Sequence, residues 1–253
     1  MGYSLVSMHP AFARTDHRPW QLPERAWSWR QSWLDLLFVH WPVPKAVLRD
    51  LVPSELEIQE FDGTSWIGLV PFRMEGVMRR PLPDVPGLSA FPELNVRLYV
   101  EADGKPGVWF LSLDATNALA IWAARRFFHL PYFRADMALT RSGDRIDYVS
   151  ERRQSSLVFR GAYRPLGAVY DSVPGTLEHF LTERYCLYAK APDGRLLRNE
   201  VHHAPWPLQT AEAEIFENTM FAPYAIRAEG TKPLLHFARR IDVVVWSAEC
   251  CRA

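Results

Sequence analysis

The feature that most constrains the fold is a two-residue alternation of apolar and polar side chains in short segments joined by turn signals. Residues 93–101 alternate in this way, and the turn ADGKPG leads from them into a second such segment at 108–115. Because successive side chains of a β-strand point to opposite faces, this pair predicts a β-hairpin. Further segments of strand length lie at 34–39, 56–61, 65–72, 130–140, 145–153, 156–164, 195–204 and 241–249.

These segments predict nine to eleven strands, mostly joined by short turns. An Asp-Gly turn at 62–63 predicts a second hairpin, between 56–61 and 65–72. Consecutive antiparallel strands with few helices indicate a mainly β (α+β) fold, either a barrel or a sandwich, and not a doubly wound parallel sheet.

Two or three helices accompany the strands. The clearest is at 116–128, where apolar residues and alanines run almost without interruption and Asp114 or Thr116 is available as the N-cap. Shorter helices are expected at 43–53 and from residue 176 onward.

The sequence predicts an irregular N-terminal arm followed by one domain. Residues 1–26 show no periodicity, so we expect an N-terminal arm there and a single domain over 27–253. The proline-rich loop at 79–92 is long enough to suggest a role at a site. A cluster of tryptophans near the arm is typical of a flap packed on the core, an interface or a cavity wall. Its members are Trp20, Trp27, Trp29, Trp33 and Trp41.

The charge balance excludes several classes of partner. Lysine plus arginine equals aspartate plus glutamate at 29 each, so no net field attracts nucleic acid or an anionic membrane surface. No apolar run approaches the roughly 18 residues of a membrane span, and the first residues lack the pattern of a signal peptide. We therefore expect a cytoplasmic protein with a small-molecule ligand, and the sequence allows a homo-oligomer without specifying one.

Metal, nucleotide and hydrolase motifs are missing from the sequence. It contains no G-x-S-x-G elbow, P-loop or G-x-G-x-x-G. His202 and His203 are adjacent, so in a strand they point to opposite faces and cannot share one metal ion. We therefore expect neither a metal site nor a cofactor.

The predicted strand at 93–101 has one polar and one apolar face. The apolar face carries Leu94, Val96, Leu98 and Val100. The polar face carries Glu93, Asn95, Arg97, Tyr99 and Glu101. This polar face is either exposed to water, as on most antiparallel sheets, or lines the cavity of a barrel, where a carboxylate, an amide and an arginine could hold a small polar ligand.

Another polar pattern, at 145–153, indicates ion pairs. Asp147, Glu151 and Arg153 share one face, and alternating signs are typical of exposed cross-strand pairs.

Four segments together resemble a known family. They are FVHWPVP, LVPSELEIQEFDGTSWIGLVPFRM, FPELNVRLYV and GVWFLSLDATNALAIWAARRFFHLPY. In this order, over roughly 27–246, they resemble the YqjF-like family of uncharacterised bacterial proteins in the acetoacetate-decarboxylase-like superfamily. The resemblance implies an antiparallel sheet around a central conical β-barrel whose interior is the ligand site.

The resemblance also implies where the chemistry departs from the decarboxylase. That enzyme forms a Schiff base on a lysine, whereas the corresponding position here is occupied by Tyr132. Lys45, Lys105, Lys190 and Lys232 fall in turns, a tail loop or an amphipathic helix, where an amine stays solvated. We therefore do not expect Schiff-base decarboxylation.

The same resemblance places an arginine and glutamates in the barrel interior. It selects Glu93, Arg97 and Tyr132 as candidate catalytic residues and Asn95 as a ligand-binding candidate. Arg97 is expected to anchor an anion, with Glu93 or another carboxylate nearby to balance it. His40 and Arg73 are candidates because each lies in a family-like motif, HWPV or VPFRM, and Arg153 is a candidate if the strand register is reversed. Alternatively, His40 is a buried core histidine whose hydrogen bonds are made within the protein and not to a ligand.

Two functions remain open. The first is binding, with or without conversion, of a small polar or carboxylate-bearing metabolite in a barrel pocket, by acid–base lyase- or hydrolase-like chemistry if the protein is an enzyme. The second is a non-catalytic ligand sensor or interaction module whose aromatic N-terminal flap gates a ligand or packs on a partner.

Overall fold

The elements follow the predicted order. A computed structural model describes residues 9–82, 89–228 and 230–251. The strands are β1 (Trp29–Val43), β2 (Glu57–Ile58), β3 (Ser65–Arg79), β4 (Phe91–Ala102), β5 (Lys105–Ala115), β6 (Tyr132–Ser142), β7 (Arg145–Arg152), β8 (Val158–Tyr170), β9 (Cys186–Lys190), β10 (Leu196–His202), β11 (Leu208–Asn218), β12 (Leu234–Val245) and β13 (Glu249–Cys250). The helices are α1 (Lys45–Leu48), α2 (Ala118–Phe128) and α3 (Leu177–Thr182), with short 3₁₀ turns at Pro10–Ala13, Arg49–Leu51 and Ala222–Tyr224. This confirms a mainly β fold with flanking helices.

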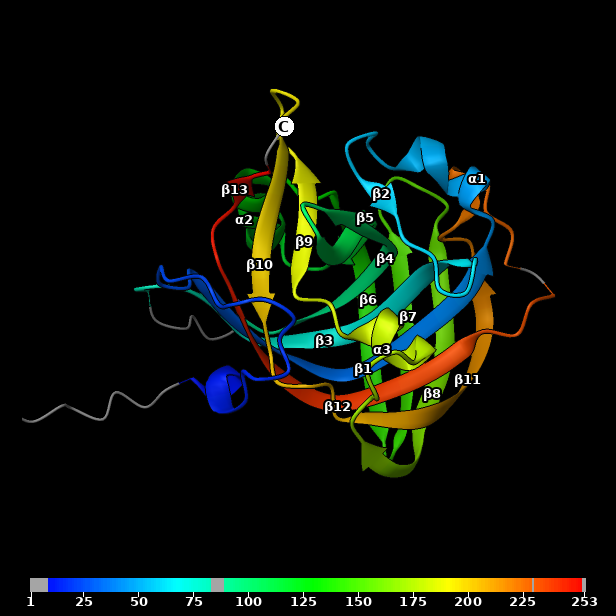
Figure 1. Ribbon diagram of the computed structural model, residues 1–253. Helices are drawn as coiled ribbons and strands as arrows, with labels where there is room; N and C mark the ends of the chain where they lie inside the picture. Colours follow the sequence, from blue (N-terminus) through cyan, green and yellow to red (C-terminus); the bar gives the residue numbers. More distant parts are fainter. Residues whose placement is uncertain (1–8, 83–88, 229, 252–253) are drawn as a thin grey trace, which may run out of the picture.

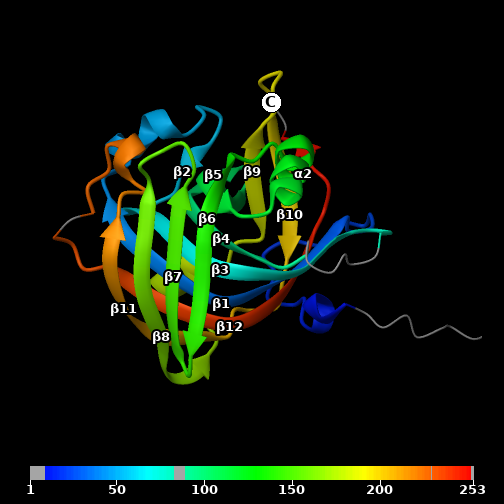
Figure 2. The ribbon, with the colours of Figure 1, turned by 180° about the vertical axis from the view of Figure 1, so that it is seen from behind.

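Hydrogen bonding closes the sheet into two rings that share a wall (Figures 1 and 2). The larger ring runs β4–β5–β6–β7–β8–β11–β12–β1–β3 and back to β4. The smaller ring runs β4–β5–β9–β10–β12–β1–β3 and back to β4. The shared wall therefore consists of β12, β1, β3, β4 and β5, with β9 and β10 over one face and β6, β7 and β8 over the other.

Two strands of the wall pair with a strand of the smaller ring along one part of their length and with a strand of the larger ring along another. Near its start β5 pairs in parallel with β9, where Val108 faces Leu187, and at its end it pairs in parallel with β6. Likewise β12 pairs with β11 at Ala238 and with β10 at Val245. Parallel neighbours need a long crossover, which α2 supplies between β5 and β6.

Both faces of the shared wall are buried. Leu37 and Val39 of β1 belong to the core of the larger ring, whereas Leu36 and Phe38 belong to the apolar cluster of the smaller ring. A strand buried on both faces is apolar nearly throughout, which explains the segment 34–39, where Asp35 is the one polar residue. The strand is longer than that segment, because residues on both sides of it also pair with β3 and β12.

Two local predictions are wrong. The expected hairpin between 56–61 and 65–72 is limited to its Asp-Gly turn, which a single antiparallel bridge between Phe61 and Thr64 closes. The strand β2 pairs instead with β4, at Glu57 and Glu101, where β4 extends past the end of its pairing with β3. The N-cap of α2 is Asn117, whose Oδ1 accepts backbone N–H bonds of 3.0 and 3.1 Å. Asp114 is not available as a cap because it is buried in β5 against Arg152, 2.7 Å away.

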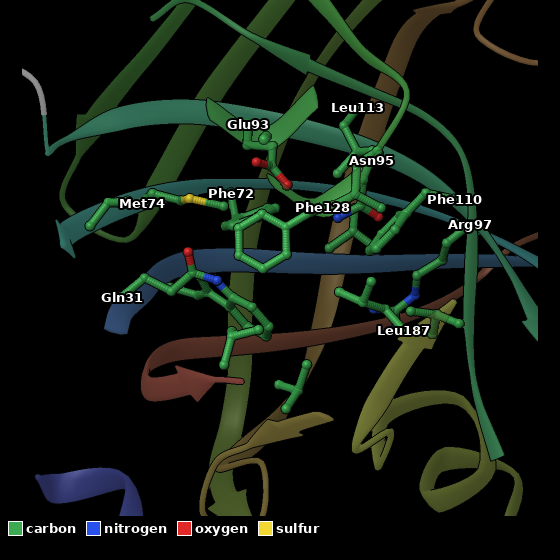
Figure 3. A pocket seen from close by; sticks show the side chains of 18 of the residues that line it. Gln31, Phe72, Met74, Glu93, Asn95, Arg97, Phe110, Leu113, Phe128 and Leu187 are labelled. Carbon is green, nitrogen blue, oxygen red and sulfur yellow. The ribbon is translucent and has the colours of Figure 1, made fainter. Parts of the chain in front are cut away.

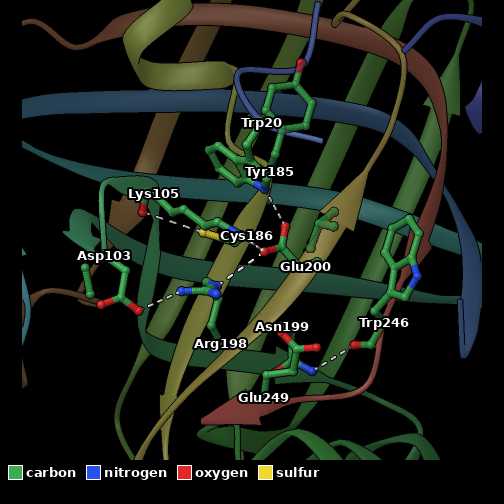
Figure 4. A network of polar contacts seen from close by, with 12 residues as sticks. Trp20, Asp103, Lys105, Tyr185, Cys186, Arg198, Asn199, Glu200, Trp246 and Glu249 are labelled. Carbon is green, nitrogen blue, oxygen red and sulfur yellow. Dashed lines mark hydrogen bonds and ion pairs between the residues drawn. The ribbon is translucent and has the colours of Figure 1, made fainter. Parts of the chain in front are cut away.

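The N-terminal arm is attached to the outside of the smaller ring through a buried carboxylate (Figure 4). Arg18 forms an ion pair with Glu200 of β10, and Trp20 donates to the same carboxylate at 2.7 Å. Lys105 at the start of β5 also binds Glu200, at 2.7 Å. Trp27 packs with Trp246 in a separate small cluster. In the described ranges, no helix is long and apolar enough to cross a membrane.

Candidate functional site

A cavity of about 140 Å³ lies within the smaller ring (Figure 3). Its lining comes from β1, β3, β4, β5, β9, β10 and β12, from the start of β6, the end of α3 and one face of α2, and from adjoining connections. Apolar residues dominate this lining, and its aromatic members include Trp29, Trp33, Phe72, Phe110 and Phe128. Of the predicted loop at 79–92, residues 83–88 lie outside the described part of the chain.

The polar face of β4 points into this cavity. Glu93, Asn95 and Arg97 line it, while Leu94 and Val96 lie in the core of the larger ring. The predicted division of the strand into two faces is therefore confirmed, and its polar face is buried rather than wet. A bulge between β4 and β5 leaves the alternation of β4 intact because the extra residue is in β5.

Glu93 and Tyr132 form a hydrogen-bonded pair in the cavity. The Tyr132 hydroxyl donates to Glu93 Oε2 at 2.6 Å, and Arg125 of α2 holds the Tyr132 carbonyl through a 2.8 Å bond from its Nε. Burial raises the pKa of Glu93 to about 8, although the hydrogen bonds from Tyr132 and Asn95 act to lower it. At neutral pH the Glu93 carboxyl is therefore mainly protonated and can donate a hydrogen bond.

Arg97 is buried without a carboxylate partner among the described residues. Its Nε donates to the Tyr99 hydroxyl at 3.2 Å and its Nη2 to the Leu181 carbonyl at 3.0 Å. The guanidinium also lies 5.1 Å from the centre of the Phe38 ring. The prediction was that Glu93 or another nearby carboxylate balances this charge; instead the Glu93 carboxyl is bound to Tyr132, and the polar contacts of Arg97 among the described residues are neutral.

His40 lies behind Arg97 and outside the residues that line the cavity. Its Nε2 is 2.5 Å from the Tyr99 hydroxyl, which already accepts a bond from Arg97. Burial and the nearby Arg97 charge lower the pKa of His40 well below its usual value, so its imidazole is neutral. A neutral ring with its proton on Nδ1 can accept the single Tyr99 proton at Nε2 while the Tyr99 oxygen accepts from Arg97. His40 is thus a core histidine, and its link to the cavity runs through Tyr99.

Gly68 makes room for this arrangement. A Cβ at residue 68 would lie 3.2 Å from both His40 Nε2 and the Tyr99 hydroxyl. The missing side chain on β3 therefore allows the His40–Tyr99 contact to form against the strand.

Arg73 and Arg153 do not reach the cavity. Arg73 alternates with Phe72 and Met74, which point inward, so its side chain faces away and pairs with Glu75. Arg153 is exposed and pairs with Asp136 at 2.6 Å. Both were expected to be ligand-binding candidates, and strand alternation and surface pairing place them elsewhere.

Two cavity residues were missed by sequence reasoning. Arg184 lies in the connection after α3, and His203 follows the end of β10. His203 Nδ1 is 2.7 Å from the Ala204 carbonyl, and burial lowers its pKa. His202 points to the other side, where it stacks on Phe12 and His17, as the adjacent-residue argument predicted. Arg184 lies outside every segment predicted as a strand, and for His203 the alternation showed only that it faces away from His202, not which of the two faces inward.

The lysines all lie outside the cavity lining. Lys45 pairs with Glu60, Lys190 with Glu55 and Lys105 with Glu200, while Lys232 is exposed in the connection before β12. Within the described ranges, no group of three or more His, Cys, Asp or Glu side chains is arranged to hold a metal ion.

Tyr99→Phe should lower the free energy of unfolding by more than the removal of a buried hydroxyl that has one hydrogen-bond partner. It leaves His40 Nε2 and the charged Arg97 Nε without their partner, so we expect a loss of about 2–3 kcal/mol in the free energy of unfolding. Tyr163→Phe is the matched control, because that buried hydroxyl serves one carbonyl, of Asp35, at 2.7 Å, and should cost about 1 kcal/mol. Urea unfolding of both variants measures the difference, and equal losses would contradict the proposed network.

The sequence matches the family model DUF2071, "Uncharacterized conserved protein (COG2071)", over residues 30–242. The chain belongs to this family. It is also 47% identical over 226 residues to "Uncharacterized protein YqjF" of Bacillus subtilis (strain 168), covering 89% of this chain and 93% of that protein. The YqjF-like resemblance is thereby confirmed.

Solved structures with the same fold are distant in sequence. The enduracididine biosynthesis enzyme MppR complexed with pyruvate gives a TM-score of 0.64 at 13% identity, covering 93% of each chain. An acetoacetate decarboxylase-like enzyme from Sphingomonas wittichii RW1 gives 0.63 at 12% identity, covering 90% of this chain and 95% of the other. The acetoacetate decarboxylase from Legionella pneumophila gives 0.59 at 15% identity, covering 99% and 98%. The fold is therefore acetoacetate-decarboxylase-like.

Proposed function

We propose that this protein binds a small carboxylate-bearing metabolite in the cavity of the smaller ring. The observation that carries the proposal is the buried Arg97 guanidinium, which lines the cavity and has only neutral polar partners among the described residues. A buried charge without a counter-charge is costly, and a carboxylate ligand would supply that counter-charge through two parallel hydrogen bonds.

The size and polarity of the cavity agree with such a ligand. Its volume of about 140 Å³ is close to that of a cavity that takes up benzene, about 150 Å³, so it suits a ligand of only a few carbon atoms. The aromatic lining would pack on the carbon skeleton, and the few polar groups would fix its orientation. A solved structure with this fold, MppR, is complexed with pyruvate, which supports this ligand class.

Any conversion of the ligand would rest on acid–base chemistry. Glu93 offers a neutral carboxylic acid, and Tyr132, 2.6 Å from it, offers a neutral hydroxyl. Because the Tyr132 proton is donated to Glu93, the donor left for a ligand oxygen is the proton of the neutral Glu93 carboxyl, which could stabilise negative charge that develops there. The lysines outside the cavity give no support to a Schiff base, so the proposed chemistry is lyase- or hydrolase-like without a covalent amine intermediate.

A non-catalytic ligand sensor is the second candidate function. The observation that favours it is the aromatic cavity lining, including Trp29 and Trp33, which suits retention of a ligand as much as its conversion. Trp20 and Trp27 lie outside the lining, so the arm does not supply an aromatic cover for the cavity. NMR of pyruvate incubated with the protein separates the two functions, since a sensor returns the ligand unchanged.

Arg97→Met should remove carboxylate binding. We expect the affinity for pyruvate, measured by isothermal titration calorimetry, to fall about 10- to 100-fold, since a charge-assisted hydrogen bond contributes about 1.5–3 kcal/mol. Arg97→Lys should recover part of the affinity because the charge returns without the planar fork. The control is Arg153→Met, which removes an exposed arginine and should leave binding unchanged.

Two outcomes would contradict the proposal. One is that the native chain binds none of pyruvate, acetoacetate and lactate. The other is that Arg97→Met binds pyruvate as tightly as the native chain does.

A further inference from the structure

A second buried arginine lies near Arg97. Arg184 also lines the cavity, and both guanidinium groups lie against the ring of Tyr99, with centres 5.4 Å from it for Arg97 and 5.1 Å for Arg184. Because both guanidinium groups contact the same ring, their centres can be no farther apart than these two distances added together. We call the part of the cavity beside Arg97 and Arg184 its inner end.

Arg184 is held firmly but is not satisfied. Its Nε donates to the Phe180 carbonyl at 2.7 Å, and its Nη1 donates to the side-chain oxygen of Gln59. Its Nη2 is buried and has no hydrogen-bond partner in the described part of the chain. Packing against the Phe180 ring, 4.4 Å from the guanidinium centre, fixes the group in place. A buried donor without a partner is rare in a folded protein and calls for an explanation.

No acidic side chain is in direct contact with either arginine within the described ranges. Glu101 reaches Arg184 only through the neutral amide of Gln59, which donates to Glu101 at 2.7 Å. Glu183 accepts bonds from the Tyr185 hydroxyl and, at 2.9 Å, from a backbone N–H, so its carboxylate is directed elsewhere. Glu93, the acidic member of the lining, is bound to Tyr132.

We infer that the inner end of the cavity binds a small dicarboxylate, with one carboxylate on Arg97 and the other on Arg184. This inference rests on the proposed carboxylate-binding function and makes it more specific. Two buried cations that repel one another are both balanced by a ligand with two negative charges, whereas a monocarboxylate leaves one of them uncompensated. The small volume, about 140 Å³, limits the ligand to a short chain such as that of malonate or succinate.

The test compares ligands that match in length and differ in charge. Calorimetry on the full chain uses succinate against butyrate and malonate against propionate, with methyl phosphate as a dianion that carries its charge on one group. We expect succinate or malonate to bind at least about 10-fold more tightly than its monocarboxylate partner. Arg184→Met should abolish this preference while keeping the monocarboxylate affinity, and Arg184→Lys should restore part of it. Arg153→Met should change neither.

Each other outcome has a definite meaning. Equal affinity of the native chain for succinate and butyrate, and for malonate and propionate, would overturn the inference, because Glu101 would then already balance Arg184 through Gln59. The inference would also fail if methyl phosphate bound more tightly than either dicarboxylate, since the charge would then not be divided between two arginines. Binding of neither class would instead refute the proposed function itself. If Arg184→Met does not fold, the ratio of dicarboxylate to monocarboxylate affinity measured on the native chain still tests the inference.

Discussion

Glu93→Gln is expected to make the protein more stable than the native chain above pH 8. The pKa of Glu93 is raised to about 8 in the folded protein, against 4.5 for an ordinary glutamate, mainly by burial. The folded state therefore binds more protons than the unfolded state between these values, and stability falls as the pH rises through this range. The stabilising contribution is complete below pH 4.5 and is gone above pH 8, a change of up to about 5 kcal/mol.

Glutamine removes this dependence while keeping the shape of the side chain. Its oxygen can still accept from Tyr132, as the Glu93 carboxyl does. We expect urea unfolding at pH 5 to give similar stabilities for the variant and the native chain. At pH 9 the variant should be more stable by several kcal/mol.

The exposed carboxylate Glu151, which pairs with Arg160, provides the control. Glu151→Gln should leave the pH dependence of the native chain unchanged. If Glu93→Gln and the native chain instead lose stability in parallel from pH 5 to pH 9, then Glu93 is ionised in the folded protein. Its partner would then have to be Arg97 rather than a neutral hydroxyl.

Alternation within one strand made the polar row of β4 predictable. Leu94 and Val96 on one face and Glu93, Asn95 and Arg97 on the other follow directly from the two-residue period. The same rule, applied from Phe72, places Arg73 on the opposite face. The prediction for Arg73 failed because it relied on a motif instead of on the strand period.

The strand pattern left open whether that polar row is exposed or buried, and only the family resemblance placed it in the barrel interior. Its burial depends on β9 and β10 crossing the wall, and on the divided pairing of β5 and β12 that attaches them. These pairings join residues far apart in the chain, such as Val108 with Leu187, and leave no local signal. Arg184 was missed for the same reason, because its place in the cavity follows from where α3 and β9 dock.

Gly107→Ala is expected to be among the most damaging single substitutions in this chain. A Cβ at residue 107 would lie 2.6 Å from Cys186 Sγ and 2.7 Å from the Cys186 backbone oxygen. The sulfur could shift, but the carbonyl belongs to β9 and can move only with its strand. We expect a loss of about 3 kcal/mol or more in the free energy of unfolding, measured in urea.

Gly76→Ala separates this steric effect from backbone strain. Residue 76 has a φ of +60°, and nothing lies within 4 Å of the position that a Cβ would take, so alanine there should cost only about 1 kcal/mol. Combining Gly107→Ala with Cys186→Ala removes the sulfur and leaves the carbonyl in place, so we expect only partial recovery of stability. Full recovery would show that the backbone contact is not limiting.

The position of Gly107 connects this packing contact to the cavity. It immediately precedes Val108, where β5 pairs with β9, and Cys186 and Leu187 of β9 line the same cavity as Arg97. A side chain at residue 107 would push β9 away from the wall at Cys186, which lines the cavity. The close approach of the two strands therefore keeps the smaller ring closed, and the small volume available to a ligand depends on it.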